Sequence, residues 1–343
     1  MTRNIRQWLA LIGLAFLLVA CSQEPKLETL QLQGKTMGTY YSVKVVAKPG
    51  ELPDLKVLQS QIDAELKQVN QEMSTYQADS ELSLLNKRHS TEATSISANL
   101  ALVLNASLEL SQQSNGSFDV TVGPLVNLWG FGPQARPDQV PSQDQIDAAK
   151  SKIGYQHIQL QDTSLIKAHP DLYIDLSAIA KGHGVDRVAD VIEAAGFSHY
   201  LVDIGGELRL KGQNDQQLAW TIAVEKPQLN SEQRIQKVLT PGDSGIATSG
   251  DYRNYFEQDG IRYSHTIDPA TGSPISNHIV SVTVVSDSSM MADGLATAYS
   301  VMGVERALEH ASTHEVATYI VEKRGDEFIE HLSSNFEPLV KTQ

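Results

Sequence analysis

The chain has 343 residues, a length typical of two average domains or one large one. Its 27 Lys and Arg against 41 Asp and Glu give a formal net charge of −14, and this acidity argues against nucleic acid as a partner, because phosphates attract a basic surface. Hydrophobic residues make up 41% and cysteine occurs once, which excludes a disordered chain, a disulfide framework and a cysteine-rich metal centre.

The first 20 residues are typical of a secretory signal peptide. Two arginines precede an apolar run, Trp8 to Ala20, that is too short to span a bilayer easily. The run ends in Leu18-Val19-Ala20-Cys21, which resembles the lipobox of bacterial lipoproteins. An uncleaved anchor helix is the alternative, but the only cysteine lies at the expected cleavage point. We therefore expect a signal peptide over residues 1–20, lipidation at Cys21, a tether over 21–33 and a lipid anchor on the periplasmic side of the envelope.

The remaining elements follow from periodicity and capping signals. We expect helices over residues 55–73, 98–114, 180–195, 288–302 and 304–312, with another from Ser142 to Gly154. We expect strands over 39–47, 172–176, 199–204, 207–211, 218–225, 261–267, 279–285, 316–322 and 326–331. Strands dominate the second half, which favours an α+β fold over a regular βαβ repeat. The sequence has no dinucleotide fingerprint at a strand–helix junction, no P-loop and no H-E-x-x-H motif.

Two segments carry groups suited to metal and phosphate. Asp293 and Thr297 share one face of a helix, and hard oxygen donors one turn apart suit Mg²⁺. An acidic residue in the first helical turn, stabilised by the helix dipole, explains Asp293 equally well. Lys181, in Ala180-Lys181-Gly182-His183-Gly184 near a helix start, offers an ammonium to a phosphate. By itself, a solvent-facing lysine is the simpler interpretation.

Two turns add further candidates. Gly205 and Gly206 join two expected strands, either as a simple hairpin turn or with amides offered to an anion. His265 precedes a Pro/Gly turn over 268–272 and is the histidine that we nominate for acid–base or phosphate-contacting work.

In this order, the segments resemble the ApbE family of periplasmic flavin transferases. The resemblance covers nearly all of residues 34–335, which we expect to form one domain. Further matching motifs are Thr36-Met37-Gly38-Thr39, Met73-Ser74-Thr75-Tyr76, Ser117-Phe118-Asp119-Val120-Thr121 with Gly123-Pro124, and Gly245-Ile246-Ala247-Thr248-Ser249-Gly250-Asp251-Tyr252.

The resemblance implies an ApbE-like, T-fold-related mixed α/β domain with FAD in a central cleft. It implies Mg²⁺-dependent transfer of FMN from FAD to a Thr or Ser hydroxyl of another protein through a phosphoester bond, with release of AMP. The acceptors would be subunits of sodium-translocating NADH:quinone reductase or of related redox complexes. An FAD pyrophosphatase that yields FMN and AMP, or a flavin-binding lipoprotein without activity, remains an alternative.

Site residues follow by position. Asp293, Thr297 and the backbone carbonyl of Ala178 would bind the metal, and His265 or Asp293 would accept the proton of the acceptor hydroxyl. The glycines of the Gly205-Gly206 turn would contact the phosphates. The other residues expected to contact FAD are Met37, Tyr76, Ser117, Phe118, Asp119, Asp175, Lys181 and Thr266.

Overall fold

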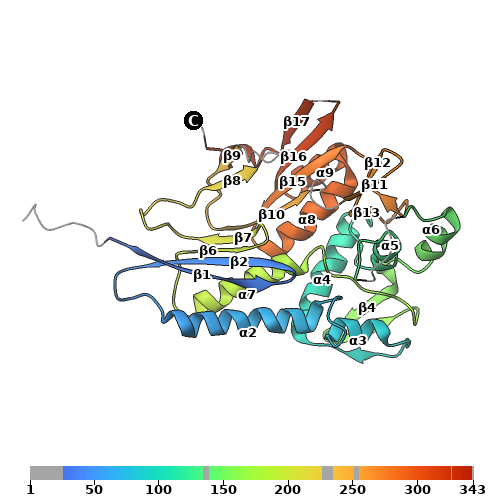
Figure 1. Ribbon diagram of the computed structural model, residues 1–343, viewed down its shortest axis with the longest axis horizontal. Coiled ribbons are helices and arrows are strands. Elements are labelled where there is room, and N and C mark those ends of the chain that lie inside the picture. The colour runs from blue at the N-terminus through green and yellow to red at the C-terminus, as the bar shows by residue number, and fades with distance from the viewer. Residues whose placement is uncertain (1–25, 134–138, 226–234, 251–254, 326, 342–343) are drawn as a thin grey trace, which may run out of the picture.

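The computed structural model describes residues 26–133, 139–225, 235–250, 255–325 and 327–341. Within these residues the main sheet has eight strands, all antiparallel to their neighbours, in the order β1-β2-β6-β7-β10-β15-β16-β17 (Figure 1). The strands are β1 (Glu28–Thr36), β2 (Thr39–Ala47), β6 (Tyr200–Ile204), β7 (Glu207–Lys211), β10 (Ser244–Gly250), β15 (Ile279–Ser286), β16 (Ala317–Arg324) and β17 (Glu327–Leu332).

Long helices cover one face of this sheet (Figure 1). They are α2 (Leu55–Met73), α7 (Ala180–Ala194), α8 (Ser289–Met302) and α9 (Val304–Thr313), and α4 (Ala98–Gln113) packs on α2 and α8. Helix α7 packs on β6 and β7, α8 packs on β10 and β15, and α2 lies against α7. The apolar residues of α2, at spacings of three and four, are buried in the core between α2, α7 and the first strands.

The opposite face of the sheet is covered by a smaller layer. The hairpin of β8 (Ile222–Glu225) and β9 (Ile235–Leu239) contributes to a second core together with Trp220 and Phe336. The short 3₁₀ helix η2 (Glu337–Leu339) follows Phe336, and the backbone amide of Thr240 donates to the Leu339 carbonyl at 2.8 Å. The end of the described chain is therefore part of the fold.

Shorter elements form the part of the molecule beyond the ends of α4 and α8 (Figure 1). One group comprises α3 (Glu81–Lys87) and the sheet β3-β5-β4, with strands β3 (Thr94–Ser95), β4 (Ile158–Gln161) and β5 (Ser164–Lys167) and the 3₁₀ helix η1 (Tyr155–His157). The other comprises α5 (Gly123–Leu128), α6 (Gln143–Lys150), β11 (Tyr255–Gln258), β12 (Ile261–Ser264), β13 (Ile267–Asp268) and β14 (Ser273–Pro274).

The α+β prediction is confirmed, and so are most of the predicted elements. The helix after Ser142 is shorter than expected, because it ends at Lys150 rather than Gly154. The expected strand 261–267 is divided between β12 and β13, and 218–225 becomes the shorter β8. The main sheet begins at Glu28, inside the segment that we expected to be a tether. Cys21 and the signal peptide lie outside the described residues.

The predicted strand at 172–176 is wrong. The segment buries apolar side chains, but none of the strands in the described part of the chain pairs with it. Its polar groups have other partners: the backbone N–H and C=O of Ile174 bond to the amide side chain of Asn86, both at 2.8 Å. The amide of Asp175 donates to the Val120 carbonyl at 2.7 Å. The apolar pattern of this segment thus indicates buried side chains rather than β-pairing. Its backbone groups form hydrogen bonds outside any sheet.

No helix in the described part of the chain is long and apolar enough to cross a bilayer.

Candidate active site

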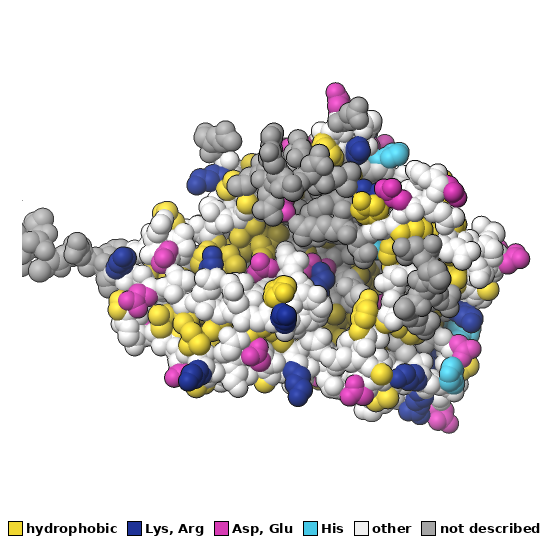
Figure 2. Space-filling view, in the orientation of Figure 1, with side chains coloured by type: hydrophobic (Ala, Val, Ile, Leu, Met, Phe, Trp, Pro, Cys, Tyr) yellow, Lys and Arg dark blue, Asp and Glu magenta, His cyan; other side chains and the backbone are white. Residues whose placement is uncertain are grey.

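A cavity of about 680 Å³ opens where α7, α8 and the strands β7, β10 and β15 meet the shorter elements. Its volume lies within the usual range for small-molecule sites. Figure 2 shows the molecule in the orientation of Figure 1, with a hollow in the middle of the visible face. Hydrophobic, acidic and basic side chains lie beside one another there.

The cavity brings together nearly all of the residues nominated from the sequence. Its lining includes Tyr76, Ser117, Phe118, Asp119, Asp175, Ala178, Lys181, Gly205, Gly206, His265, Thr266, Asp293 and Thr297. Met37 is the exception: it does not belong to the lining, and its side chain packs on the apolar core next to Gly184. The roles of the lining residues in binding and catalysis stay predictions.

Helix α8 carries Asp293 in its second turn, so stabilisation by the helix dipole in a first turn does not explain this residue. The helix start is capped by other groups, since Ser288 accepts from the Met291 amide and the Asp186 carboxylate accepts from two more amides. Asp293 is buried, and its Oδ2 accepts the amide of Gly182 at 3.0 Å. Its carboxylate is thereby held at the cavity wall, one turn before Thr297.

Gly182 allows this contact because α7 and α8 approach each other closely there. A Cβ added at Gly182 would lie 2.3 Å from the carbonyl oxygen of Ser289 and 2.8 Å from the Cα of Met290. A side chain at residue 182 would therefore separate the helices and move its amide away from Asp293.

Lys181 is not a solvent-facing lysine. Its ammonium donates to Glu207 Oε1, and its side chain is 34% exposed against 5% for Glu207. Burial lowers the pKa of Lys181, but the carboxylates of Asp293 and Glu207 more than offset this and raise it above its ordinary value. Burial also raises the pKa of Asp293 and of Glu207. Two buried carboxylates thus share one ammonium at the cavity wall.

Gly205 and Gly206 form the two-residue turn between β6 and β7, and both have positive φ, at 64° and 104°. Their amides already have acceptors within the protein. Gly206 donates to Asp203 Oδ1 at 2.9 Å, and Gly205 donates to the Tyr40 carbonyl at 3.1 Å. The hairpin interpretation is confirmed, and the role of these two glycines in binding an anion stays a prediction.

Asp119 and Asp175 line the cavity while bracing their own loops. Asp119 Oδ1 accepts from the amide and hydroxyl of Thr121, at 2.7 and 2.6 Å, and its Oδ2 accepts from the Tyr155 amide at 3.0 Å. Asp175 Oδ1 accepts from the amide of Ser177 at 2.9 Å and from its hydroxyl. These bonds fix the shape of the loops that form this wall.

His265 lies on a part of the lining rich in aromatic residues. Its ring meets Phe131 edge-on with centroids 6.4 Å apart, and Phe131 in turn packs on Phe256 at 5.6 Å. Phe256 stacks on Tyr263 at 5.0 Å. This row of rings connects β11 and β12 to the end of α5 and supports the imidazole at the cavity.

Sequence reasoning missed Glu207, although it directly follows the Gly205-Gly206 turn. The signal was an acidic residue at the start of a strand, next to a tight turn. The turn alone accounted for the two glycines, so the residue after them received no role. The ion pair of Glu207 with Lys181 joins β7 to α7, which only the tertiary structure brings together.

The donor set fits a divalent cation with few protein ligands. No group of three or more His, Cys, Asp or Glu side chains is placed to hold a metal within the part of the chain that the structure describes. The predicted set needs only one such group, Asp293, with the Thr297 hydroxyl and the Ala178 carbonyl on the same lining. Mg²⁺ commonly binds proteins through one or two carboxylates and takes water and phosphate oxygens elsewhere.

Comparisons with known proteins identify the family. Residues 37–320 match the model of the ApbE family. The FAD:protein FMN transferases of Vibrio cholerae and Escherichia coli K12 are 48% and 40% identical, with 98% and 97% of this chain and 99% and 97% of theirs covered.

Solved structures show the same relationship. The flavin transferase ApbE from Vibrio cholerae superimposes with a TM-score of 0.86 at 48% identity, over 91% of this chain and 99% of that one. The apo form of the Pseudomonas stutzeri flavinyl transferase ApbE gives 0.84 at 39% identity, over 91% and 97%. The family resemblance and the predicted fold are confirmed, and the chain belongs to the ApbE family.

Proposed function

We propose that the chain is an FAD:protein FMN transferase that works with Mg²⁺ and modifies a Thr or Ser hydroxyl of an acceptor protein. The observation that carries the proposal is the meeting of Asp293, Thr297 and Lys181 in one cavity of about 680 Å³. Relatives that cover nearly the whole chain carry this activity in their names.

The cation site supplies the electrostatics. When bound, Mg²⁺ neutralises charge on the diphosphate and on the departing AMP. Asp293, Thr297 and the Ala178 carbonyl would hold it. Lys181 contributes a fixed positive charge to the same phosphates, in a cavity wall that otherwise carries carboxylates.

The reaction then needs a proton acceptor and an aligned hydroxyl. The hydroxyl oxygen of the acceptor forms a bond to the phosphorus on the FMN side while the bond from that phosphorus to the AMP oxygen breaks. We assign the hydroxyl proton to His265, because an imidazole accepts protons near neutral pH, whereas Asp293 accepts from Gly182 and would hold the cation. A threonine hydroxyl is a weak nucleophile, so positioning and charge stabilisation contribute more than the base.

The direct test uses FAD, Mg²⁺ and a purified subunit of sodium-translocating NADH:quinone reductase, the class of acceptor that we propose. The intact mass of the subunit should rise by one FMN, with one AMP released for each, and replacing its acceptor threonine by valine should abolish the gain. Free FMN with an unmodified acceptor would instead indicate an FAD pyrophosphatase. FAD that is bound but intact would indicate a flavin carrier.

We also propose that Cys21 anchors the protein by lipid on the periplasmic side of the envelope. The lipobox and the basic and apolar segments before it support this. Ser22 after the cysteine favours the outer membrane over the inner one. The Cys21→Ala protein should leave the detergent phase in which the lipidated protein partitions, and its continued presence there would contradict lipidation.

A further inference from the structure

Glu207 has a position that folding alone does not explain. It opens β7 directly after the Gly205-Gly206 turn, it lines the cavity, and its side chain is 5% exposed. Oε1 accepts from Lys181, whereas Oε2 is buried and has no hydrogen-bonding partner among the described residues. A buried carboxylate oxygen without a partner is costly, which indicates a role in the site rather than in stability.

The neighbouring charges suggest what this role is. Lys181 has a flexible four-carbon side chain, and its ammonium interacts electrostatically with the carboxylates of both Glu207 and Asp293. The structure has the ammonium hydrogen-bonded to Glu207, while Asp293 Oδ2 accepts from the backbone of Gly182. If Lys181 paired with Asp293 instead, it would occupy the carboxylate that the cation requires.

We propose that Glu207 is a positioning residue: by holding the Lys181 ammonium, it keeps the Asp293 carboxylate available to the divalent cation. This inference rests on the proposed cation site at Asp293. If the inference is right, the effect of Glu207 on cation affinity depends on Lys181. A carboxylate that only added negative charge to the site would raise cation affinity with or without Lys181.

The experiment measures Mn²⁺ affinity calorimetrically on the whole protein without flavin. Glu207→Ala should weaken Mn²⁺ binding about tenfold or more, because the released ammonium pairs with Asp293. Glu207→Gln keeps an acceptor oxygen for Lys181 and should lose much less. Adding Lys181→Met to Glu207→Ala should restore Mn²⁺ affinity to within about threefold of Lys181→Met alone, a non-additivity typical of directly coupled residues.

Two results would overturn the inference. One is an unchanged Mn²⁺ affinity in Glu207→Ala. The other is additivity, with equal losses in Glu207→Ala and Glu207→Gln and no rescue by Lys181→Met, since Glu207 would then contribute charge alone. Thermal unfolding of each variant excludes loss of the fold as the cause.

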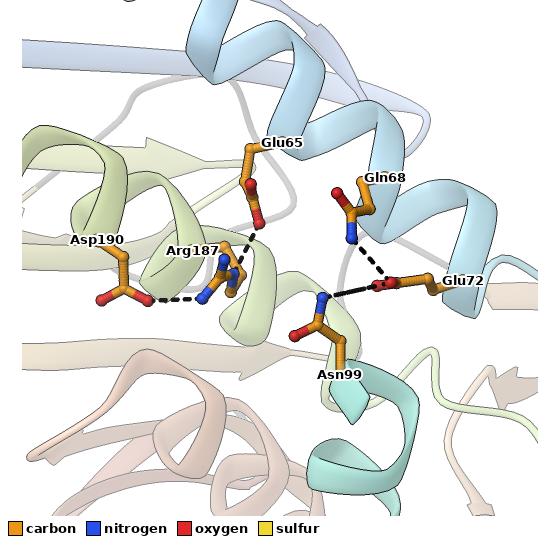
Figure 3. A network of polar contacts seen from close by, with 6 residues as sticks. All are labelled: Glu65, Gln68, Glu72, Asn99, Arg187 and Asp190. Atoms are coloured by element: carbon orange, nitrogen blue, oxygen red, sulfur yellow. Dashed lines mark hydrogen bonds and ion pairs between the residues drawn. The ribbon is translucent and has the colours of Figure 1, made fainter. Parts of the chain in front are cut away.

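Glu65→Gln is the matched control. Figure 3 shows Glu65 on α2 reaching Arg187 on α7, where its Oε1 accepts from Nε at 2.7 Å, and Glu65 does not belong to the cavity lining. This variant removes the same charge from a comparable ion pair, so its Mn²⁺ affinity should match wild type.

Asp293→Asn separates the two proposals. If this variant binds Mn²⁺ as tightly as wild type, the cation site of the proposed function is wrong. If it loses Mn²⁺ while Glu207→Ala does not, only the positioning role of Glu207 fails.

Discussion

An ammonium acts on phosphate as a point charge, so in the proposed function the removal of Lys181 should affect FAD binding more than the metal requirement. A hydrogen bond to a charged group contributes about 1.5–3 kcal/mol, and Lys181→Ala should therefore weaken FAD binding by about ten- to a hundredfold. Lys181→Arg keeps the charge and should lose less. A fluorescence titration of FAD at constant Mg²⁺ measures both, and an unchanged dissociation constant for Lys181→Ala would show that this ammonium does not bind the phosphates of FAD.

His183 should make the free energy of unfolding depend on pH. Its side chain is buried on α7, and its Nε2 has no partner among the described residues. Burial lowers the pKa of His183 to about 4. The unfolded chain gains a proton below about pH 6.5 and the folded chain does so only near pH 4, so the free energy of unfolding should fall between these values by at most about 3 kcal/mol.

Urea unfolding from pH 4 to 8 measures this dependence. Replacing His183 by Gln should flatten the difference between pH 6.5 and pH 4, whatever its effect on stability at neutral pH. Identical pH profiles for the two proteins would show that His183 does not contribute.

At the scale of elements, the crossing of α7 and α8 shapes the site. Gly182→Ala places a methyl group against the backbone of Ser289 and should destabilise the fold by about 1–3 kcal/mol, as overpacking commonly does. It should also weaken Mn²⁺ binding by moving the amide that holds Asp293. Gly294→Ala is the comparison, because its Cβ would lie 2.8 Å from the flexible end of Leu110 and the side chain can yield.

Chemical unfolding and Mn²⁺ titration of both variants check this. If Gly182→Ala is as stable as wild type and binds Mn²⁺ equally well, α7 and α8 tolerate a larger separation at this position.

The elements that the sequence predicted best are those with strong local signals. Helix α2 has a regular apolar spacing and an Asp54 cap, and the Ser97 cap fixed the start of α4. Strand β1 was missed because little of its surface is buried, with Leu32 and Thr36 as its inward residues at the sheet edge. The segment 172–176 was misassigned because burial and β-pairing give the same apolar pattern.

Local patterns nominated Asp293, Thr297, Lys181 and His265 one segment at a time, and only the family resemblance predicted that they share one site. Its residues come from segments as distant as Tyr76 and Thr297, and no local pattern brings them together. Contacts that depend on tertiary structure, such as the Lys181–Glu207 pair and the occupied amides of Gly205 and Gly206, could not be predicted from the motifs.

At the scale of the whole molecule, the boundary between tether and fold can be tested. A chain that starts at Ser22 should keep its transferase activity, because the residues removed precede β1. A chain that starts at Thr36 lacks β1, which pairs with β2 along its length and buries Leu32. Its melting temperature should fall by more than about 5 °C. Equal melting curves for the two proteins would mean that β1 is not part of the stable fold.

The central claim is that Asp293 holds the cation on which transfer depends. The measurement that tests it most directly is the rate of FMN transfer against Mg²⁺ concentration for wild type, Asp293→Asn and Thr297→Ala, with circular dichroism to confirm folding. Asp293→Asn should lose nearly all transfer at ordinary Mg²⁺ and recover partly at high Mg²⁺ or with Mn²⁺. Thr297→Ala should lose less, because a hydroxyl is a weaker ligand than a carboxylate. Full activity in Asp293→Asn, or wild-type transfer in excess EDTA, would contradict the account.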